Sequence, residues 1–191
     1  MVSHPLARRY LKKPPELIIV DDAAFDWDQR MSALVKCQRI VQVSSGLIEN
    51  LEPTELKFII GHELGHLIRG DQHPQNSVWM TALSRKLNQR SERMADQIGV
   101  LLSGASAECA KTALNKAISL HTKEVEKGLD WMPQGFRDYI VGSITRGSRT
   151  YPSLQSRFKL IDKAVEDSQR NPDWATRVLQ DRLDQLHERL Q

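Results

Sequence analysis

"PTELKFIIGHELGHLIRG", residues 53–70, has the pattern of an amphipathic helix with polar groups set into an apolar run. Pro53 suits a first helical turn, and Gly70 suits a C-terminal stop. The apolar residues recur at helical spacing, at Leu56, Ile59, Ile60, Leu64, Leu67 and Ile68. Two histidines and a glutamate inside such a run require polar partners or an ion.

His62 and His66 lie four residues apart, which places both imidazoles on one helix face, about 6 Å apart. Together they can bind a single zinc ion. Glu63 is rotated by about 100° around the helix axis, so it does not comfortably bind the same ion. It can instead reach a metal-activated water, where a general base belongs. The alternative is a surface helix with solvated side chains, but the apolar neighbours favour a metal site.

A catalytic zinc site needs a third protein ligand. The stretch "SERMADQIG", residues 91–99, offers Glu92 and Asp96 on one helix face. If that face packs against the first helix, Glu92 can reach the ion, and Asp96 can accept a hydrogen bond from a ligand histidine. Two alternatives remain. His73, in the turn after the first helix, is a weaker candidate ligand, and Glu92 can instead pair with a neighbouring arginine on a solvated face.

The composition is that of an ordinary globular domain. Hydrophobic residues make up 40% of the 191 residues, and the net charge of +3 is too small to indicate a nucleic-acid partner. The chain contains no run of 18 consecutive apolar residues, so we predict no transmembrane segment. The N-terminal apolar run "LIIV" is too short for a secretory signal, so we expect a cytoplasmic protein.

The pattern along the chain predicts a mostly helical α+β fold with a small N-terminal β-sheet. Strands are expected over 16–22 and 36–46, and helices over 53–70, 77–104, 106–128, 153–168 and 171–190, with a short helix within 131–153. Ser106 is a plausible N-cap and Gly104 a helix stop. We expect one domain, residues 1–170, followed by a C-terminal amphipathic helix, 171–191, that docks on it or partly covers the cleft.

Two motifs together resemble a known family. "GHELGH" (61–66) followed by "ERMAD" (92–96) is similar to the HtpX-type and CAAX-prenyl-protease-type zinc metallopeptidases, which are gluzincins with HExxH and E-x-x-A-D motifs. The resemblance covers about residues 16–165. It implies a zincin-like fold and one Zn²⁺ per chain. It makes His62, His66 and Glu92 the ligands, Glu63 the catalytic base, and Asp96 the support of a ligand histidine. Without a membrane helix, the chain is similar to the small soluble members.

The chain departs from the family at two places. The family has a His-Pro dipeptide and a downstream arginine, whereas "YPSLQSRF" (151–158) has Tyr151 in place of the histidine, with Arg157 following. The Tyr151 phenol can donate to a developing oxyanion, or it is only a buried tyrosine. Arg157 is expected to be a structural or substrate-orienting cation. "RMSALVKCQRIVQV" (30–43) lacks the family's asparagine on the strand where an extended peptide would pair.

These observations predict a zinc-dependent endopeptidase that hydrolyses peptides or unfolded proteins through a metal-bound water activated by Glu63. The alternative is a latent or inactive gluzincin that acts as a metal-stabilised binding or regulatory module. Glu63 beside the ligands favours catalysis, because a structural zinc site is closed by a fourth ligand and needs no base. The oligomeric state does not follow from the sequence.

Overall fold

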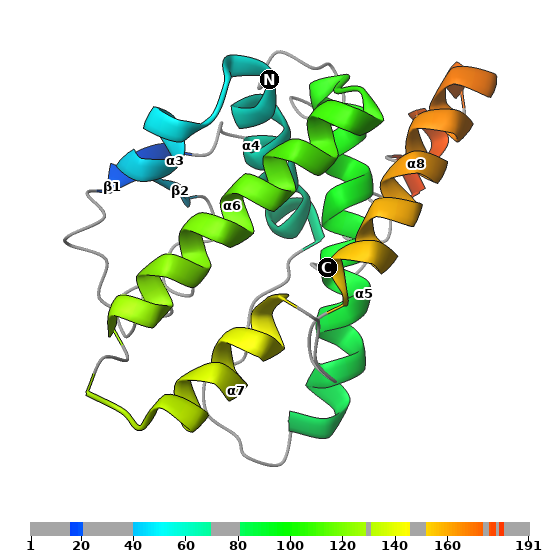
Figure 1. The fold of residues 1–191 in the computed structure, drawn as a ribbon. Coiled ribbons are helices and arrows are strands. Elements are labelled where there is room, and N and C mark those ends of the chain that lie inside the picture. Colours follow the sequence, from blue (N-terminus) through cyan, green and yellow to red (C-terminus); the bar gives the residue numbers. More distant parts are fainter. Residues whose placement is uncertain are drawn as a thin grey trace.

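The computed structural model describes residues 16–20, 40–69, 81–128, 131–145, 152–173, 176–178 and 180–181. In chain order, its elements are β1 (Glu16–Val20), β2 (Ile40–Ser44), α3 (Ser45–Asn50), α4 (Pro53–Arg69), α5 (Thr81–Ser103), α6 (Ala107–Gly128), α7 (Gln134–Thr145) and α8 (Leu154–Arg170) (Figure 1). Helices dominate these residues, and the two strands make one small sheet, which confirms the expected mostly helical α+β class. Among the helices so described, none is long and apolar enough to cross a membrane.

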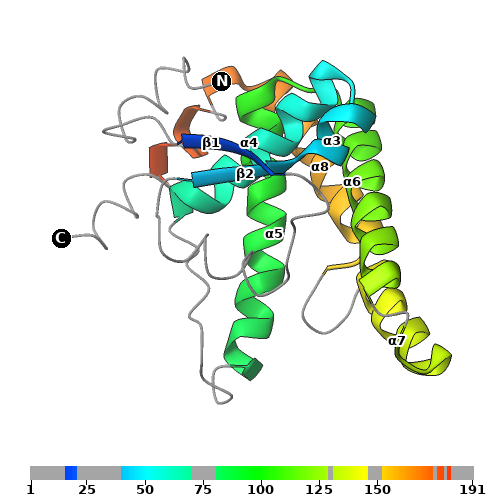
Figure 2. The ribbon, with the colours of Figure 1, turned by 90° about the vertical axis from the view of Figure 1, so that its left-hand side faces the viewer.

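The sheet is a parallel pair, in which Leu17 of β1 lies opposite Val41 of β2, and Ile19 lies opposite Val43. Val41 and Val43 are buried and form a core cluster with Leu64 of α4. Figure 2 shows the two strands side by side, next to α4. The sheet therefore covers one side of the helix that carries the two histidines.

α4 and α5 form a closely packed antiparallel pair at the centre of the fold (Figure 1). A Cβ atom added at Gly65 would lie 2.9 Å from the Cα atom of Ala95, and one at Gly99 would lie 3.1 Å from the backbone nitrogen of His62. Because non-bonded atoms do not normally approach so closely, a larger residue at Gly65 would push the helices apart. The histidine-bearing face of α4 therefore lies directly against the face of α5 that carries Glu92.

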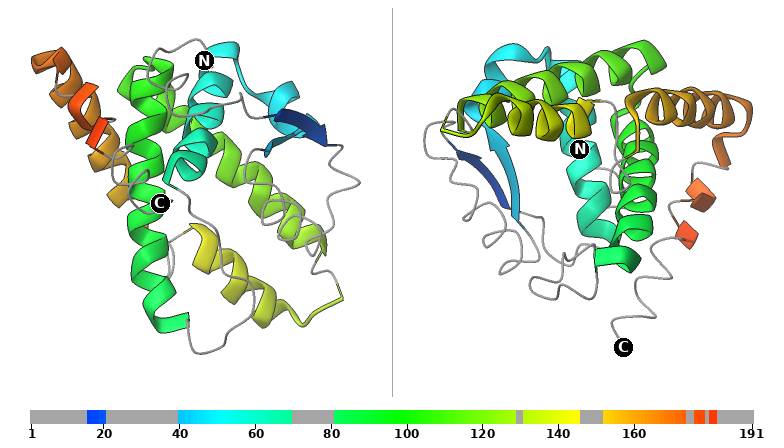
Figure 3. Two further views of the ribbon diagram at one scale, coloured as in Figure 1. Left: turned by 180° about the vertical axis from the view of Figure 1, so that it is seen from behind. Right: turned by 60° about the horizontal axis from the view of Figure 1, so that its bottom comes forward.

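The larger core cluster lies where α6 and α8 pack against α4 and α5. Its buried residues are Leu51, Phe58, Ile59, Val100, Ala110, Ala113, Leu114, Ile161 and Ala164. Figure 3 shows α8 and the sheet on opposite sides of the α4–α5 pair. An ion pair between Lys111 and Asp162 links α6 to α8. The four helices thus form one packed unit.

A second ion pair links α6 to α4. The Lys116 ammonium donates to the Glu55 carboxylate at 2.8 Å, and the same carboxylate accepts from the backbone N–H of Glu52. Burial alone would raise the pKa of Glu55, but the hydrogen bonds from Lys116 and Glu52 and the Lys116 charge lower it. Glu55 is therefore an ionised, satisfied group that fixes the start of α4.

Several helix boundaries follow the capping signals in the sequence. α5 ends at Ser103, and Gly104 adopts a φ of 64°, which confirms the expected glycine stop. The Ser106 hydroxyl accepts from the backbone N–H of Cys109 at 3.2 Å, which confirms it as the N-cap of α6. α8 ends at Arg170, and the described residues of 172–173, 176–178 and 180–181 are helical. The division into 1–170 and 171–191 stays a prediction.

The strand predicted over 36–46 is wrong at its C-terminal end. β2 stops at Ser44, and Ser45 and Gly46 begin the short helix α3. The Ser44 hydroxyl accepts from the backbone N–H of Leu47 at 3.2 Å, so this serine is a helix N-cap as well as the last strand residue. The Ser-Ser-Gly run indicates a strand end equally well, which is why the sequence pattern missed the helix.

Candidate metal centre

Three potential metal-binding side chains converge between α4 and α5. The Nε2 atoms of His62 and His66 lie 3.1 Å apart, and their rings are nearly perpendicular. The Glu92 carboxylate lies 3.6 Å from Nε2 of His62 and 3.5 Å from Nε2 of His66. Among the described residues, these three form the cluster of candidate ligands whose donor atoms all lie within 4.8 Å of one another. The convergence expected from the two motifs is present.

The spacing of these donors suits a tetrahedral ion. Donors held tetrahedrally at about 2.0–2.1 Å from zinc lie about 3.4 Å from one another. The separations in this cluster, 3.1, 3.5 and 3.6 Å, bracket that value. Two imidazole nitrogens and one carboxylate oxygen are also a donor set that zinc accepts. The cluster therefore fits a zinc ion in both chemistry and spacing.

Asp96 lies behind His62, one helical turn beyond Glu92. Its Oδ1 atom is 3.0 Å from Nδ1 of His62, and its carboxylate is fully buried. Arg157 of α8 donates to both carboxylate oxygens, from Nε at 2.7 Å and from Nη2 at 2.6 Å. The Asp96 carboxylate thus positions the ring of His62, and the Arg157 guanidinium positions Asp96.

The charge state of Asp96 follows from these contacts. Complete burial alone would raise its pKa, but the Arg157 charge, the Arg157 hydrogen bonds and the contact with His62 lower the pKa to about 2. At neutral pH Asp96 is therefore a carboxylate, which accepts the Nδ1 proton of His62. That arrangement leaves the Nε2 lone pair of His62 directed toward Glu92 and His66.

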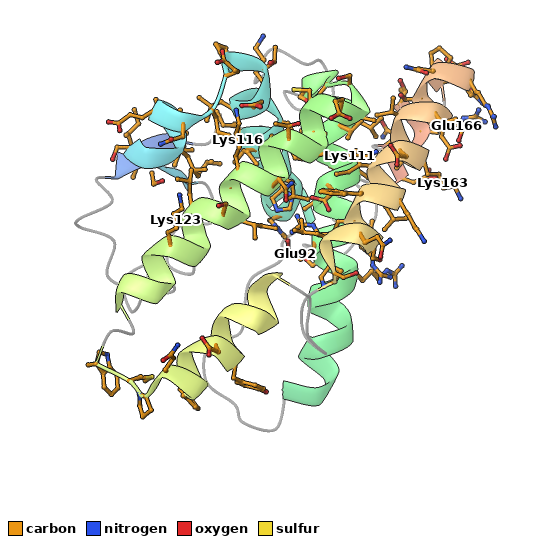
Figure 4. The ribbon with its side chains drawn as sticks, viewed as in Figure 1. Glu92, Lys111, Lys116, Lys123, Lys163 and Glu166 are labelled. Carbon is orange, nitrogen blue, oxygen red and sulfur yellow. The ribbon has the colours of Figure 1, made fainter. Side chains whose placement is uncertain are left out.

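Arg157 also contacts the candidate ligand Glu92, because its Nη2 atom lies 3.3 Å from the Glu92 carboxylate. This cation comes from α8 and is buried, so the contact differs from the alternative pairing with a neighbouring arginine on a solvated face. Figure 4 shows Glu92 near the middle of the view, whereas Lys163 and Glu166 project outward from α8. The Arg157 side chain is only 6% exposed. The arginine that the family motif singled out is therefore buried at the candidate site.

The outer nitrogen of His66 has a different partner. Its Nδ1 atom lies 3.1 Å from the hydroxyl oxygen of Ser91, a buried residue of α5. Reasoning from the sequence missed this contact. The signal was available, because Ser91 directly precedes Glu92 and lies on the α5 face that turns toward α4.

Of the remaining candidates, Glu63 is the one that lies in the described part of the chain. Glu63 is half-buried on α4 and is not among the converging donors, in keeping with its expected rotation away from the ion. Tyr151 and His73 lie outside the described residues. Their roles as an oxyanion donor and as an alternative ligand therefore stay predictions.

A comparison with family models bears on the part of this site that lies on α4. Searches of curated proteins and of solved structures found no significant match. The model of peptidase family M48 matches residues 20–84, about a third of the chain, which includes both histidines and Glu63 but ends before Glu92. The third donor is therefore an independent observation, made on α5. Over these residues the chain is similar to the M48 metallopeptidases, and the three-residue cluster is compatible with a metal site.

Proposed function

We propose that the protein is a zinc-dependent endopeptidase of the HtpX-type or CAAX-prenyl-protease-type group. The observation that carries this proposal is the convergence of His62, His66 and Glu92 at tetrahedral donor spacing, beside a glutamate that is not a donor. The order His-Glu-x-x-His on α4, followed by Glu92, Ala95 and Asp96 on α5, supports the choice of group.

The donor set supports a catalytic site over a structural one. A structural zinc is closed by four protein ligands, whereas a catalytic zinc has three and keeps a position for solvent or substrate. Among the described residues, the cluster offers three. When bound, zinc polarises the scissile carbonyl and makes water a nucleophile near neutral pH.

Glu63 is the proposed general base. It follows a donor histidine by one residue on α4, it is half-buried, and it is not among the three converging donors. Glu63 would accept the proton of the attacking water and pass it to the leaving amine. Tyr151 is proposed to donate its phenolic proton to the developing oxyanion. The substrate is proposed to be a peptide or an unfolded protein segment.

The other residues orient the donors. Asp96 accepts the Nδ1 proton of His62 and fixes its ring, and Arg157 holds Asp96 and Glu92 together. Such partners of a ligand typically change metal affinity or activity by about 10- to 100-fold when they are removed. The proposed site therefore depends on α8 as well as on α4 and α5.

The test combines metal analysis with Glu63→Gln. We expect the wild type to bind about one zinc per chain and to cleave members of a panel of peptides and unfolded proteins. Glu63→Gln should keep the zinc and lose activity by about 10²- to 10⁴-fold, because the base is gone while the donors remain. Glu52→Gln, an exposed glutamate just before α4, is the matched control and should retain activity.

Two results would contradict the proposal. Equal cleavage by wild type and Glu63→Gln would exclude Glu63 as the base. A zinc-loaded wild type that cleaves no member of the panel would favour the alternative, a metal-stabilised binding or regulatory module.

A further inference from the structure

We propose that Ser91 is a positioning residue for the candidate ligand His66. The inference rests on the proposed zinc site and extends it to a residue that neither the HExxH motif nor the ExxAD motif contains. Its basis is the hydrogen bond between the Ser91 hydroxyl and Nδ1 of His66, at 3.1 Å.

The orientation of the His66 ring explains how this contact would position the ligand atom. Nε2 of His66 lies near Nε2 of His62 and near the Glu92 carboxylate, so Nδ1 must point away from the three donors. The Ser91 hydroxyl lies within hydrogen-bonding distance of Nδ1. When Nδ1–H donates to the hydroxyl oxygen, the proton is fixed on Nδ1, and the Nε2 lone pair is free to bind a metal.

The two histidines have partners of unequal strength. His62 faces a buried carboxylate, which Arg157 holds in place, whereas His66 faces a neutral hydroxyl. A hydrogen bond to an ionised acceptor is about twice as strong as one between neutral groups. The His66 side chain is also more exposed, at 21% compared with 10% for His62. Of these two contacts, the one between Ser91 and His66 is therefore the weaker, and it restrains the more exposed ring.

The simpler alternative is that Ser91 serves only its own helix. A serine within a helix often bonds the carbonyl one turn earlier, as Ser103 does on α5, where its hydroxyl donates to the carbonyl of Gly99 at 2.6 Å. Such a bond affects the helix and not the ring of His66. Ser103 is therefore a matched control on the same element.

The test compares zinc affinities of purified, metal-free variants by competition with a chromophoric chelator. Ser91→Ala should weaken zinc binding by about 10- to 100-fold. Ser91→Thr and Ser91→Val have nearly the same shape and differ in the hydroxyl, so Thr should bind zinc more tightly than Val by at least about tenfold. Ser103→Ala should match the wild type, because its hydroxyl lies away from the site. Circular dichroism checks that each variant is folded.

A second readout reports on the ligand geometry directly. With cobalt(II) in place of zinc, the visible absorption bands should shift or broaden in Ser91→Ala and Ser91→Val and stay unchanged in Ser91→Thr. A purely structural serine would not give this pattern. If Ser91→Ala does not fold, the comparison of Ser91→Thr with Ser91→Val still tests the role of the hydroxyl.

The outcomes separate the two proposals. If the wild type binds zinc and all Ser91 variants match it in affinity and cobalt spectrum, the role of Ser91 is refuted while the zinc site stands. If the wild type binds no zinc, the proposed function itself fails.

Discussion

At the residue scale, the site depends on a buried acid that stays ionised. Asp96 is completely buried, and an isolated carboxylate there would be protonated, because removing a charge from water is costly. The guanidinium of Arg157 makes two hydrogen bonds to it, at 2.6 and 2.7 Å, and reverses that preference. The charge on Asp96 is therefore a product of tertiary packing, since Arg157 is distant in sequence.

The pKa of Asp96 predicts how stability depends on pH. This pKa is about 2 in the folded chain and has an ordinary value of 3.8. Its ionisation therefore stabilises the fold above pH 3.8, and the stabilisation is lost as the pH falls through 3.8 toward 2. The contribution is about 2 kcal/mol. It should appear in urea unfolding of the metal-free protein at a series of pH values.

Asp96→Asn supplies the comparison for this prediction. At neutral pH the variant should be less stable by about 3–5 kcal/mol, because the buried Arg157 loses the carboxylate that accepts two of its hydrogen bonds. The difference from the wild type should narrow by about 2 kcal/mol as the pH falls from about 5 to about 2. Asp162→Asn, which removes an exposed partner of Lys111, should cost at most about 1 kcal/mol. If the unfolding free energies of wild type and Asp96→Asn change with pH in parallel, the lowered pKa assigned to Asp96 is contradicted.

At the element scale, local patterns were predictable and the packing partners were not. The helical period places His62 and His66 on one face and Glu92 and Asp96 on another, and the structure confirms both faces. Which faces meet depends on contacts between residues distant in sequence. Ser91 was missed for this reason. α3 was missed because a serine has the same local signature at a helix start as at a strand end.

The small residues between α4 and α5 lead to a prediction about the distance between the two helices. Gly65→Ala places a methyl group 2.9 Å from Cα of Ala95, so the helices must separate. Overpacking should cost about 1–3 kcal/mol, against a gain of up to about 1 kcal/mol in helix propensity. The more sensitive measurement is zinc affinity, which should fall by at least about tenfold as Glu92 moves away from the histidines.

The control for Gly65→Ala is a helical glycine with space around it. Gly135 lies near the start of α7, where an added Cβ atom meets nothing within 4 Å. Gly135→Ala should therefore leave zinc affinity unchanged and leave stability equal or slightly higher. If Gly65→Ala binds zinc like the wild type, the close helix contact is not what aligns the donors.

At the scale of the whole molecule, the candidate site joins three helices. α4 supplies the two histidines, α5 supplies Glu92, Asp96 and Ser91, and α8 supplies Arg157, while α6 is tied to α4 and α8 by ion pairs. The α+β class followed from the sequence because it depends on periodicity alone. The docking of the C-terminal segment, the role of Tyr151 and the cytoplasmic location stay predictions, because they depend on contacts and partners beyond any local pattern.

Because the donors come from two helices held by a third, a bound metal should stabilise the entire fold. A ligand that binds only the folded state adds about 2.7 kcal/mol when its concentration is 100 times its Kd. For a domain of this size, that corresponds to an increase in Tm of about 5–10 °C. Thermal unfolding with excess zinc and with a chelator measures this shift without any reference to activity. Glu92→Gln should lose the shift, whereas Glu52→Gln should keep it, because Glu52 is exposed and lies outside the cluster. An equal shift in wild type and Glu92→Gln would mean that zinc binds elsewhere, and the two-helix centre would have to be abandoned.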